Sequence, residues 1–338
     1  MGSVKDLKII NPPTENTEGK GYFTFSDRYS VFDWGEMPDL ITNKGAALSL
    51  IGAFFFEELE KQGIKTHYLG LVEDGREKKL AELKGPSNVM AVKLLRVIKP
   101  TLANNQYQYD AYKNIKSNFL IPLEVIYRNS LPAGSSVFKR LKSGQTTISD
   151  LGFDKLPEPG QKLNPPLLDV STKLEEIDRY ISWTEALAIS GLSQSQLDSV
   201  KNLVLKINSY ITDTVSHFEL INEDGKFEFG VNSQGEIVLV DVLGTPDECR
   251  FTFNATPVSK EIARIYYRKS DWVNQISQAK SADPINWKKS CPAPEALPTE
   301  LHKLISFVYQ SFCNELTGRQ WFDSPDLKSI LSDIKNYL

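Results

Sequence analysis

The chain has 338 residues, 41% of them hydrophobic, and a formal net charge of −4. These values are typical of a globular protein with room for two lobes, and they disfavour a disordered chain. No block of Lys and Arg is present. We therefore expect no nucleic-acid partner, and an anionic ligand would have to be held by a few well-placed cations.

Targeting and redox features point to the cytoplasm. The N-terminal residues 1–10 lack the apolar core of a signal peptide, and the longest apolar run, 46–56, is too short to cross a bilayer. The three cysteines, Cys249, Cys291 and Cys313, show no CxxC spacing and are predicted to be free thiols rather than zinc ligands. We therefore expect a cytoplasmic protein with no membrane partner.

The N-terminal part is predicted to contain short strands followed by a helix. Residues 3–10 and 22–25 have strand patterns, and Asn11 with the two prolines after it ends the first of them. Asn43 is a candidate N-cap for an amphipathic helix that ends at Gly63.

The middle of the chain alternates β-rich and polar stretches. Two β-rich runs, 88–98 and 119–128, are separated by a polar segment, 99–117, for which a long loop or a small hairpin is expected. The proline-rich residues 156–169 are predicted to be irregular. Apolar residues at helical spacing predict a long amphipathic helix over 197–218.

The last quarter of the chain has helical spacing of its apolar residues. This pattern begins near Lys260 and includes one stripe starting at Leu301 and another starting at Leu327. Strands in the first three quarters and helices at the end predict an α+β fold.

A β-hairpin is predicted around the loop 232–235. This loop would put Lys226 opposite Asp241 and Glu228 opposite Leu239, so that an ammonium and two carboxylates share one face. Such a face suits a nucleotide-bound Mg²⁺, because Mg²⁺ takes one or two protein carboxylates together with phosphate oxygens and water. A hairpin with its polar face in water remains the alternative that the pattern alone leaves open.

Seven segments, in order from residue 2 to about residue 253, resemble the SAICAR synthetase family. They are GSVKDL at 2–7, SDRYSVFD at 26–33, NKG at 43–45, IPLEVIYR at 121–128, STK at 171–173 with Asp178, KFEFG at 226–230, and Asp241 with TPDECR at 245–250. Each segment alone is weak, but seven in register are a strong signal. The resemblance favours the metal interpretation of the hairpin over a solvated polar face.

The resemblance implies a two-lobed α+β fold related to ATP-grasp and protein-kinase nucleotide folds, with a helical C-terminal extension. A β-rich N-terminal lobe would span 1–120 and a larger α+β lobe 121–338, with ATP between them. The implied enzyme is an ATP-dependent ligase of de novo purine biosynthesis. It would join L-aspartate to carboxyaminoimidazole ribonucleotide (CAIR) through an acyl phosphate and release SAICAR, ADP and phosphate. Positioning and charge stabilisation, rather than a nucleophilic triad, would carry this chemistry.

The resemblance also implies roles for residues around ATP. Lys5 and Lys93 would approach the nucleotide, and its adenine would dock against Leu120 and Pro122. The Mg²⁺ ligands would be the two carboxylates of the hairpin, Glu228 and Asp241.

A second set of implied residues concerns CAIR and aspartate. Arg128, Ser135 and Arg250 would hold the ribonucleotide phosphate, because arginine binds phosphate through planar, paired donors. Asp224 and Lys226 would meet the imidazole, and together with Arg128 they are the expected catalytic residues. Lys173 and Asp178 would line the substrate side, while Asp33 and the segment 43–45 would shape the aspartate pocket.

Some residues depart from the family pattern. Ser3 stands where many members have a basic residue, and Val242 replaces an acidic residue after the metal-binding Asp241. The polar segment 99–117 and the tail after Lys260 exceed the compact form of the family, and either could support a homo-oligomer or cover the surface.

Two other functions remain open from the sequence. One is a kinase-like phosphotransferase acting on another small molecule; a protein kinase is disfavoured because no HRD or DFG signature is present. The other is a non-catalytic nucleotide-binding relative, which the presence of both Glu228 and Asp241 disfavours.

Overall fold

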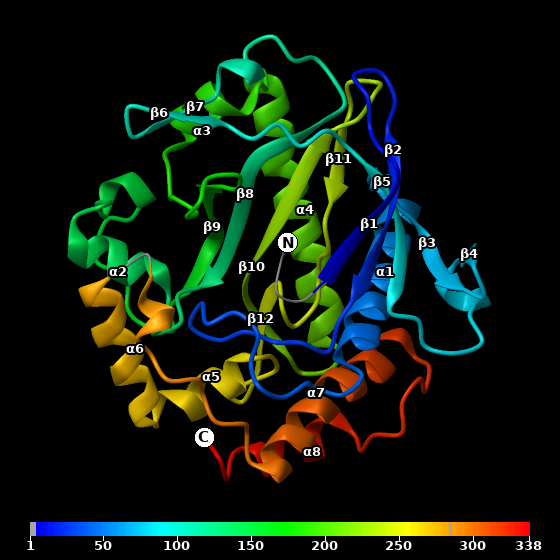
Figure 1. Cartoon of the computed structure of the whole chain (residues 1–338), viewed down its shortest axis with the longest axis vertical. Coiled ribbons are helices and arrows are strands. Elements are labelled where there is room, and N and C mark those ends of the chain that lie inside the picture. The colour runs from blue at the N-terminus through cyan, green and yellow to red at the C-terminus, as the bar shows by residue number, and fades with distance from the viewer. Residues whose placement is uncertain (1–4, 284–285) are drawn as a thin grey trace.

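The protein is built around antiparallel β-sheets (Figure 1). The structure is a computed structural model that describes residues 5–283 and 286–338. The departure predicted at Ser3 lies outside the described residues. The strands are β1 Lys5–Asn11, β2 Gly19–Phe25, β3 Tyr68–Glu73, β4 Arg76–Lys78, β5 Val89–Leu94, β6 Thr101–Ala103, β7 Gln106–Gln108, β8 Phe119–Ser130, β9 Lys162–Thr172, β10 Ile221–Val231, β11 Ile237–Val240, β12 Cys249–Phe253 and β13 Thr256–Pro257.

Helices cover these sheets and make up the C-terminal part. They are α1 Lys44–Lys61, α2 Ser136–Ser143, α3 Trp183–Ser190, α4 Gln194–Ser216, α5 Glu261–Arg268, α6 Asp271–Ala282, α7 Thr299–Thr317 and α8 Leu327–Ile334, with short 3₁₀ turns η1 Leu80–Glu82, η2 Asp110–Tyr112, η3 Ser149–Leu151 and η4 Trp287–Lys289. None of the helices within the described residues is long and apolar enough to cross a membrane. The predicted α+β class is confirmed.

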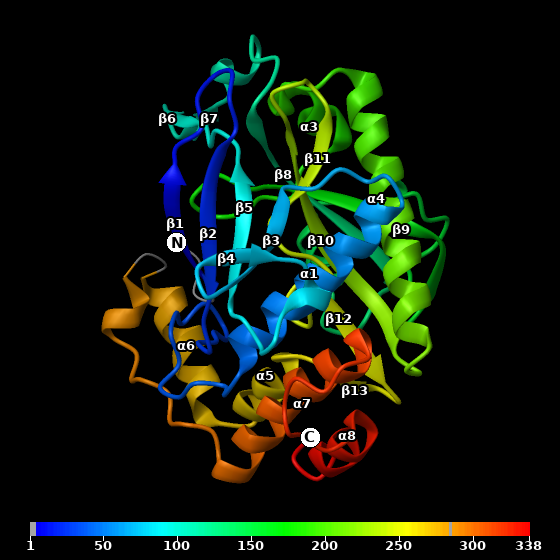
Figure 2. The same cartoon turned by 90° about the vertical axis from the view of Figure 1, so that its right-hand side faces the viewer.

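Two main sheets divide the strands. The first has the order β1-β2-β5-β3-β4, and the second has the order β13-β12-β10-β8-β9 with β11 added to β10. The segment expected to be a loop or small hairpin, 99–117, contains the two-stranded hairpin β6-β7. Helix α4 packs against β8 and β10, and α1 packs against β2, β3 and β5 (Figure 2).

The long strands of the second sheet have two different faces. On β8, Val125 and Tyr127 belong to the hydrophobic core, whereas the alternate residues Glu124 and Arg128 are buried polar side chains. This alternation follows from the two-residue period of a strand. One face of the sheet is therefore core, and the other is lined with charge.

The prediction for residues 156–169 is wrong, since β9 begins at Lys162. This strand lies at the edge of the sheet, where β8 is its neighbouring strand. Pro165 and Pro166 fall where the register shifts, between the pairs Leu167 with Arg128 and Lys162 with Ser130. An edge strand tolerates proline because one side of it has no neighbour that needs an N–H donor.

The predicted register of the β10-β11 hairpin is also wrong by one residue. Val231 pairs with Ile237 and Glu228 with Val240, so the loop contains five residues instead of four. The side-chain Oδ1 of Asn232 accepts hydrogen bonds from the N–H groups of Gln234, at 3.0 Å, and Glu236, at 2.8 Å. The longer loop is stabilised by these bonds, which residue spacing alone does not reveal.

Helix α1 begins where predicted, but Asn43 does not cap it with its side chain. The carboxylate of Asp27 accepts hydrogen bonds from the N–H groups of Gly45, at 2.9 Å, and Asn43, at 3.1 Å. The cap therefore comes from a residue that precedes the helix by a whole loop. A Cβ atom on Gly45 would lie 2.6 Å from the Phe25 carbonyl oxygen, so this close approach requires glycine.

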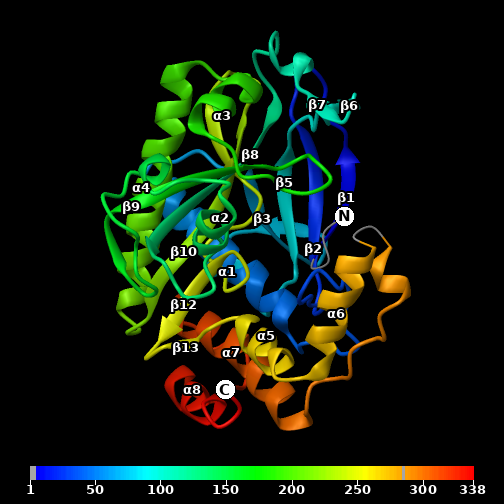
Figure 3. The same ribbon diagram turned by 90° about the vertical axis from the view of Figure 1, so that its left-hand side faces the viewer.

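The C-terminal part is helical as predicted, and it returns to the N-terminal part of the chain. Helix α7 packs against α1 and α8. Helix α6 lies beside the loop after β2 (Figure 3), where Lys280 Nζ donates to the Phe32 carbonyl at 3.0 Å. The C-terminal helices thus support the first sheet and the loop that leads from it.

Candidate active site

A ladder of alternating charges lies on the polar face of the second sheet. Lys226 Nζ and Lys173 Nζ each lie 2.8 Å from Glu124 Oε1. Lys173 Nζ is also 2.7 Å from Glu228 Oε1, an ion pair without hydrogen-bond geometry. The strands β8, β9 and β10 are neighbours, so their alternate residues meet at this point.

The surroundings of the ladder keep both lysines charged. Burial alone would lower the pKa of Lys226, but the carboxylates of Glu248 and Glu124 outweigh it and raise that pKa. The pKa of Lys173 is likewise raised, because Glu228 and Glu124 outweigh the effect of burial. The two ammonium groups are fixed cations rather than proton acceptors.

The two carboxylates predicted to bind metal interact with each other. Burial, followed by the charge of Asp241, raises the pKa of Glu228 to about 8. Burial alone would also raise the pKa of Asp241, but its ion pair with Lys5 outweighs burial and lowers that pKa. Asp241 has φ +64°, and its carbonyl accepts a hydrogen bond from His67 Nε2 at 2.9 Å. The observed register differs by one residue from the predicted one, but it does not separate the two acids, because the chain turns at Asp241.

These carboxylates fit a magnesium ion that shares its coordination with phosphate. No group of three or more His, Cys, Asp and Glu side chains that could hold a metal occurs among residues 5–283 and 286–338. Mg²⁺ needs only one or two carboxylates, since it retains water and takes phosphate oxygens. Without a metal ion, burial and Asp241 favour the protonated form of Glu228. A bound Mg²⁺ would favour the carboxylate form, because it would supply a positive charge beside it.

The residues predicted for the nucleotide lie on both sides of the hairpin. Leu120 packs against a small apolar cluster of Leu95, Val238 and Val240, separate from the main core. Lys93 pairs with Glu18 at 3.0 Å and lines a cavity of about 690 Å³ next to Val238. The buried Pro122 contributes its carbonyl, which accepts a hydrogen bond from the Lys173 N–H at 3.1 Å.

A cavity of about 740 Å³ lies over the charged sheet face. It brings together most of the residues predicted for CAIR and aspartate, namely Asp33, Arg128, Asp178, Asp224, Lys226 and Arg250. Lys173 directly follows β9 and pairs with Glu124, which lines the cavity. Ser135 does not line it, because its Oγ caps α2 by accepting from the Val137 N–H, and Ser136 faces the cavity instead.

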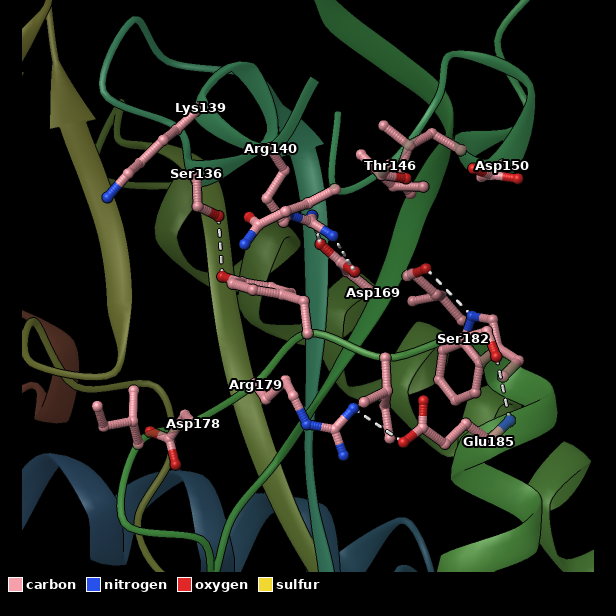
Figure 4. Close-up of a pocket in the computed structure, with 18 of the residues that line it drawn as sticks. Ser136, Lys139, Arg140, Thr146, Asp150, Asp169, Asp178, Arg179, Ser182 and Glu185 are labelled. Atoms are coloured by element: carbon pink, nitrogen blue, oxygen red, sulfur yellow. Dashed lines mark hydrogen bonds and ion pairs between the residues drawn. The ribbon is translucent and has the colours of Figure 1, made fainter. Parts of the chain in front are cut away.

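Arg128 is held by carboxylates on both sides and is only 2% exposed. Its Nη1 lies 3.2 Å from Asp224 Oδ2, and its Nη2 lies 3.1 Å from Asp169 Oδ2. Arg250 forms two hydrogen bonds with Asp224, the one from its Nε to Oδ1 measuring 2.6 Å. Asp169 also pairs with Arg140 of α2 (Figure 4).

The segment predicted for the aspartate pocket contains a fully buried lysine. Lys44 Nζ pairs with Asp247 Oδ2 at 2.8 Å, and Tyr309 of α7 donates to Asp247 Oδ1 at 2.8 Å. Asp247 lines the 740 Å³ cavity together with Lys260. Burial would raise the pKa of Asp247, but Lys260 and Lys44 outweigh it and lower that pKa. The C-terminal helices therefore take part in shaping this cavity.

The site residues that the sequence did not predict fall into two groups. Glu124 could have been found, because it shares the strand face of Arg128 at a spacing of four residues. Glu248 lies inside the TPDECR segment that carries the resemblance. By contrast, Arg140 and Tyr309 had no signal in the sequence, because their partners Asp169 and Asp247 lie far from them along the chain.

A family model, curated relatives and solved structures all relate this chain to SAICAR synthetases. The family model described as SAICAR synthetase matches residues 13–279. The chain is 48% identical over 338 residues to a putative phosphoribosylaminoimidazole-succinocarboxamide synthase of Archaeoglobus fulgidus, covering 100% of both chains. It is 31% identical over 311 residues to the phosphoribosylaminoimidazole-succinocarboxamide synthase of Thermoplasma acidophilum, covering 88% of this chain and 93% of that one.

Solved structures share the architecture. A SAICAR-synthase from Saccharomyces cerevisiae complexed with SAICAR has a TM-score of 0.66 at 23% identity, covering 95% of this chain and 94% of that one. A SAICAR synthetase in complex with ADP has a TM-score of 0.60 at 23% identity, covering 95% and 97%. These likenesses define the class of fold, a two-sheet α+β protein. The chain belongs to the SAICAR synthetase family, as the resemblance predicted.

Proposed function

We propose that the charged cleft is where this chain joins L-aspartate to CAIR, with consumption of ATP, to give SAICAR. The family assignment carries the reaction, which is a step of purine biosynthesis. The observation that supports the location is the meeting of Glu228 and Asp241 with the ammonium groups of Lys173 and Lys226, because Lys226 and its partner Glu124 line the 740 Å³ cavity.

The chemistry requires activation of a carboxylate. The γ-phosphoryl group of ATP passes to a carboxylate oxygen of CAIR, which breaks the bond to ADP and forms an acyl phosphate. The amine of aspartate then attacks the acyl carbon, loses a proton and displaces phosphate, which leaves an amide. Both steps develop negative charge on oxygen, so fixed cations are the groups that stabilise them.

Lys226 and Lys173 are well suited to this role. Their raised pKa values keep them protonated at neutral pH. Their shared partner Glu124 fixes the position of both ammonium groups, so little reorganisation is needed when charge develops. We propose that Lys226 contacts the CAIR carboxylate and that Asp224, beside Arg250, orients the imidazole end of CAIR.

The nucleotide would lie between the two sheets, and the division 1–120 and 121–338 would describe the two lobes around it. Its adenine would dock on the apolar cluster of Leu95, Leu120 and Val238, with Lys5 and Lys93 near the phosphates. Glu228 and Asp241 would hold Mg²⁺, which when bound would offset the negative charge of the phosphate oxygens.

The direct test is an assay with the purified chain, Mg-ATP and CAIR, with and without aspartate. We expect SAICAR and ADP to form together, and only when aspartate is present. Transfer of phosphate without aspartate dependence would indicate the kinase-like alternative. Nucleotide binding with no turnover would indicate the non-catalytic alternative, and either result would overturn the proposal.

The metal assignment needs its own variant. We expect Asp241→Asn to reduce turnover about a hundredfold or more, because a ligand that neutralises phosphate charge is lost. The matched control is Glu219→Gln, which changes an exposed acid just before β10 that pairs with Lys328 at 2.6 Å on the surface. Full activity of the Asp241 variant, or an equal loss in both variants, would contradict the assignment.

A further inference from the structure

A chain of five alternating charges leads from α2 to the substrate cavity, which its last three members, Arg128, Asp224 and Arg250, line. Arg140 pairs with Asp169, Asp169 with Arg128, Arg128 with Asp224, and Asp224 with Arg250. Each carboxylate is shared by two guanidinium groups. The five side chains therefore have three positive and two negative charges, and one positive charge in the chain has no carboxylate of its own.

The excess charge is available at the cavity. Arg140, Asp169 and Arg128 are buried, while the Arg250 side chain is 33% exposed and lines the cavity with Arg128. Within the described residues, the buried Nε atoms of Arg128 and Arg140 have no hydrogen-bond partner. A buried charge is costly unless it is paired, so such a network is stable only when all its members are present or when an anion joins it.

Arg140 contacts the network in a second way, through Tyr180. The Arg140 guanidinium stacks on the Tyr180 ring with 3.8 Å between the group and the ring centroid. Tyr180 Oη lies 2.8 Å from Ser136 Oγ, and both oxygens accept from Arg128 Nη2, at 3.3 and 3.1 Å. Figure 4 shows the Arg140 side chain directed toward Asp169, with Ser136 beside it.

We infer that Arg140, with Asp169 and Tyr180, positions Arg128 for the phosphate-bearing end of the ribonucleotide. Arg140 neutralises part of the Asp169 charge and fixes the Tyr180 ring. Without it, the full charge of Asp169 would attract Arg128 and compete with an incoming anion. Arg140 is therefore a positioning residue that sets affinity for CAIR and does not touch the reacting carboxylate. This inference rests on the proposed function of the cavity.

The chain provides a matched control for Arg140. Arg140 and Arg179 both line a neighbouring cavity of about 1000 Å³ (Figure 4). Like Arg140, Arg179 pairs with carboxylates, those of Glu175 and Glu185. Its side chain is 48% exposed, and within the part of the chain that the structure describes none of its hydrogen bonds or ion pairs involves Arg128. Replacing Arg179 removes the same charge from the same region but leaves the network complete.

The experiment measures KM for each of the three substrates in Arg140→Gln, Tyr180→Phe and Arg179→Gln. We expect the KM for CAIR to rise about tenfold or more in Arg140→Gln and about threefold in Tyr180→Phe, with kcat and the KM values for ATP and aspartate within about twofold of wild type. Arg140→Lys should recover part of the CAIR affinity, because it restores the charge without the paired donors. Arg179→Gln should leave all three KM values unchanged.

Several outcomes would overturn the inference without touching the proposed function. An unchanged KM for CAIR in both Arg140→Gln and Tyr180→Phe would do so, and so would an equal rise for all three substrates. If Arg140→Gln fails to fold, Tyr180→Phe decides, because it removes only one hydroxyl group. Calorimetric binding of ribose 5-phosphate gives a readout independent of turnover, and its affinity should fall in the same variants. A wild-type chain that forms no SAICAR would instead overturn the proposed function.

Discussion

At the scale of single residues, two neighbours on one strand face show how surroundings determine charge. Lys226 and Glu228 are separated by one residue on β10, and both have a raised pKa. For Lys226 this means a firmly held positive charge. For Glu228 it means a carboxyl that favours its neutral form, because burial and Asp241 oppose its ionisation. The same direction of shift therefore has opposite consequences for charge at neutral pH.

The raised pKa of Glu228 predicts a pH-dependent stability difference. Its pKa in the folded chain is about 8 against an ordinary 4.5, so the folded state binds this proton more tightly than the unfolded state does. The resulting stability is complete below about pH 4.5 and is lost as pH rises toward 8. Glu228→Gln has no such dependence. We expect the Tm of the variant, relative to wild type, to increase from pH 5 to pH 8.

Thermal unfolding of both proteins without nucleotide or metal measures this difference. Turnover of Glu228→Gln should nevertheless fall about a hundredfold or more, since the variant lacks one of the two proposed metal ligands. A Tm difference that stays constant over the pH range would contradict the stated pKa direction.

The buried pair of Lys44 and Asp247 makes a second prediction at this scale. Lys44→Met would remove the buried ammonium group that pairs directly with Asp247, and we expect a loss of about 3–5 kcal/mol in the free energy of unfolding. Tyr309→Phe removes one hydrogen bond to the same carboxylate and should cost about 1–3 kcal/mol. Urea unfolding measures both values, and the prediction is wrong if the tyrosine variant loses more than the lysine variant.

At the scale of elements, the start of α1 depends on a residue outside the helix. Asp27 lies in the SDRYSVFD segment that carries part of the family resemblance, yet its carboxylate accepts from two N–H groups at the start of α1. The segment therefore has a structural role in addition to any role in binding substrates. It ties the end of β2 to the helix that covers the first sheet.

This cap can be tested by substitution. We expect Asp27→Ala to lower the free energy of unfolding by about 1–2 kcal/mol, because two N–H groups lose their acceptor. Asp27→Asn retains one carbonyl oxygen and should recover part of the loss. Chemical denaturation compares the variants, and an alanine variant as stable as wild type would rule out the cap.

At the scale of the whole molecule, the C-terminal helices hold the loop that follows β2. Trp34 contacts the rings of Trp272 and Trp287, with centroids 5.6 and 5.8 Å apart. Lys280 pairs with Asp33 at 2.9 Å. Phe32 and Asp33 have φ values of +53° and +63°, in a backbone region that residues other than glycine seldom adopt. Contacts from α6 and η4 therefore stabilise an unfavourable loop conformation next to the substrate cavity.

Removing the central ring of this cluster should loosen the loop more than the rest of the chain. We expect Trp34→Ala to cost about 2 kcal/mol, from the loss of two aromatic contacts, and to increase hydrogen exchange over residues 29–37 more than in β8 or β10. Trp321→Ala is the control, because that ring stacks on Arg319 in another part of the C-terminal segment. Equal exchange changes in both variants would contradict the prediction.

Much of the fold and of the candidate site could be predicted from the sequence. A β-rich run predicted β8, the hairpin pattern predicted β10, and helical spacing predicted α4, α7 and α8. The ordered segments predicted the family, and most of the residues expected for CAIR and aspartate line one cavity. The strand and helix predictions share a physical cause, since each depends on the spacing of residues that are close in sequence.

The tertiary structure alone decided how these pieces meet. The hairpin register depends on the Asn232 side chain, the α1 cap comes from Asp27, and β9 accepts prolines because it is an edge strand. Arg140 and Tyr309 reach the site from α2 and α7. The sequence by itself determined the family and the charged strand faces, and it predicted which two carboxylates are candidates for a metal. It could not determine contacts between distant segments, because their free energy depends on packing that local residue patterns do not encode.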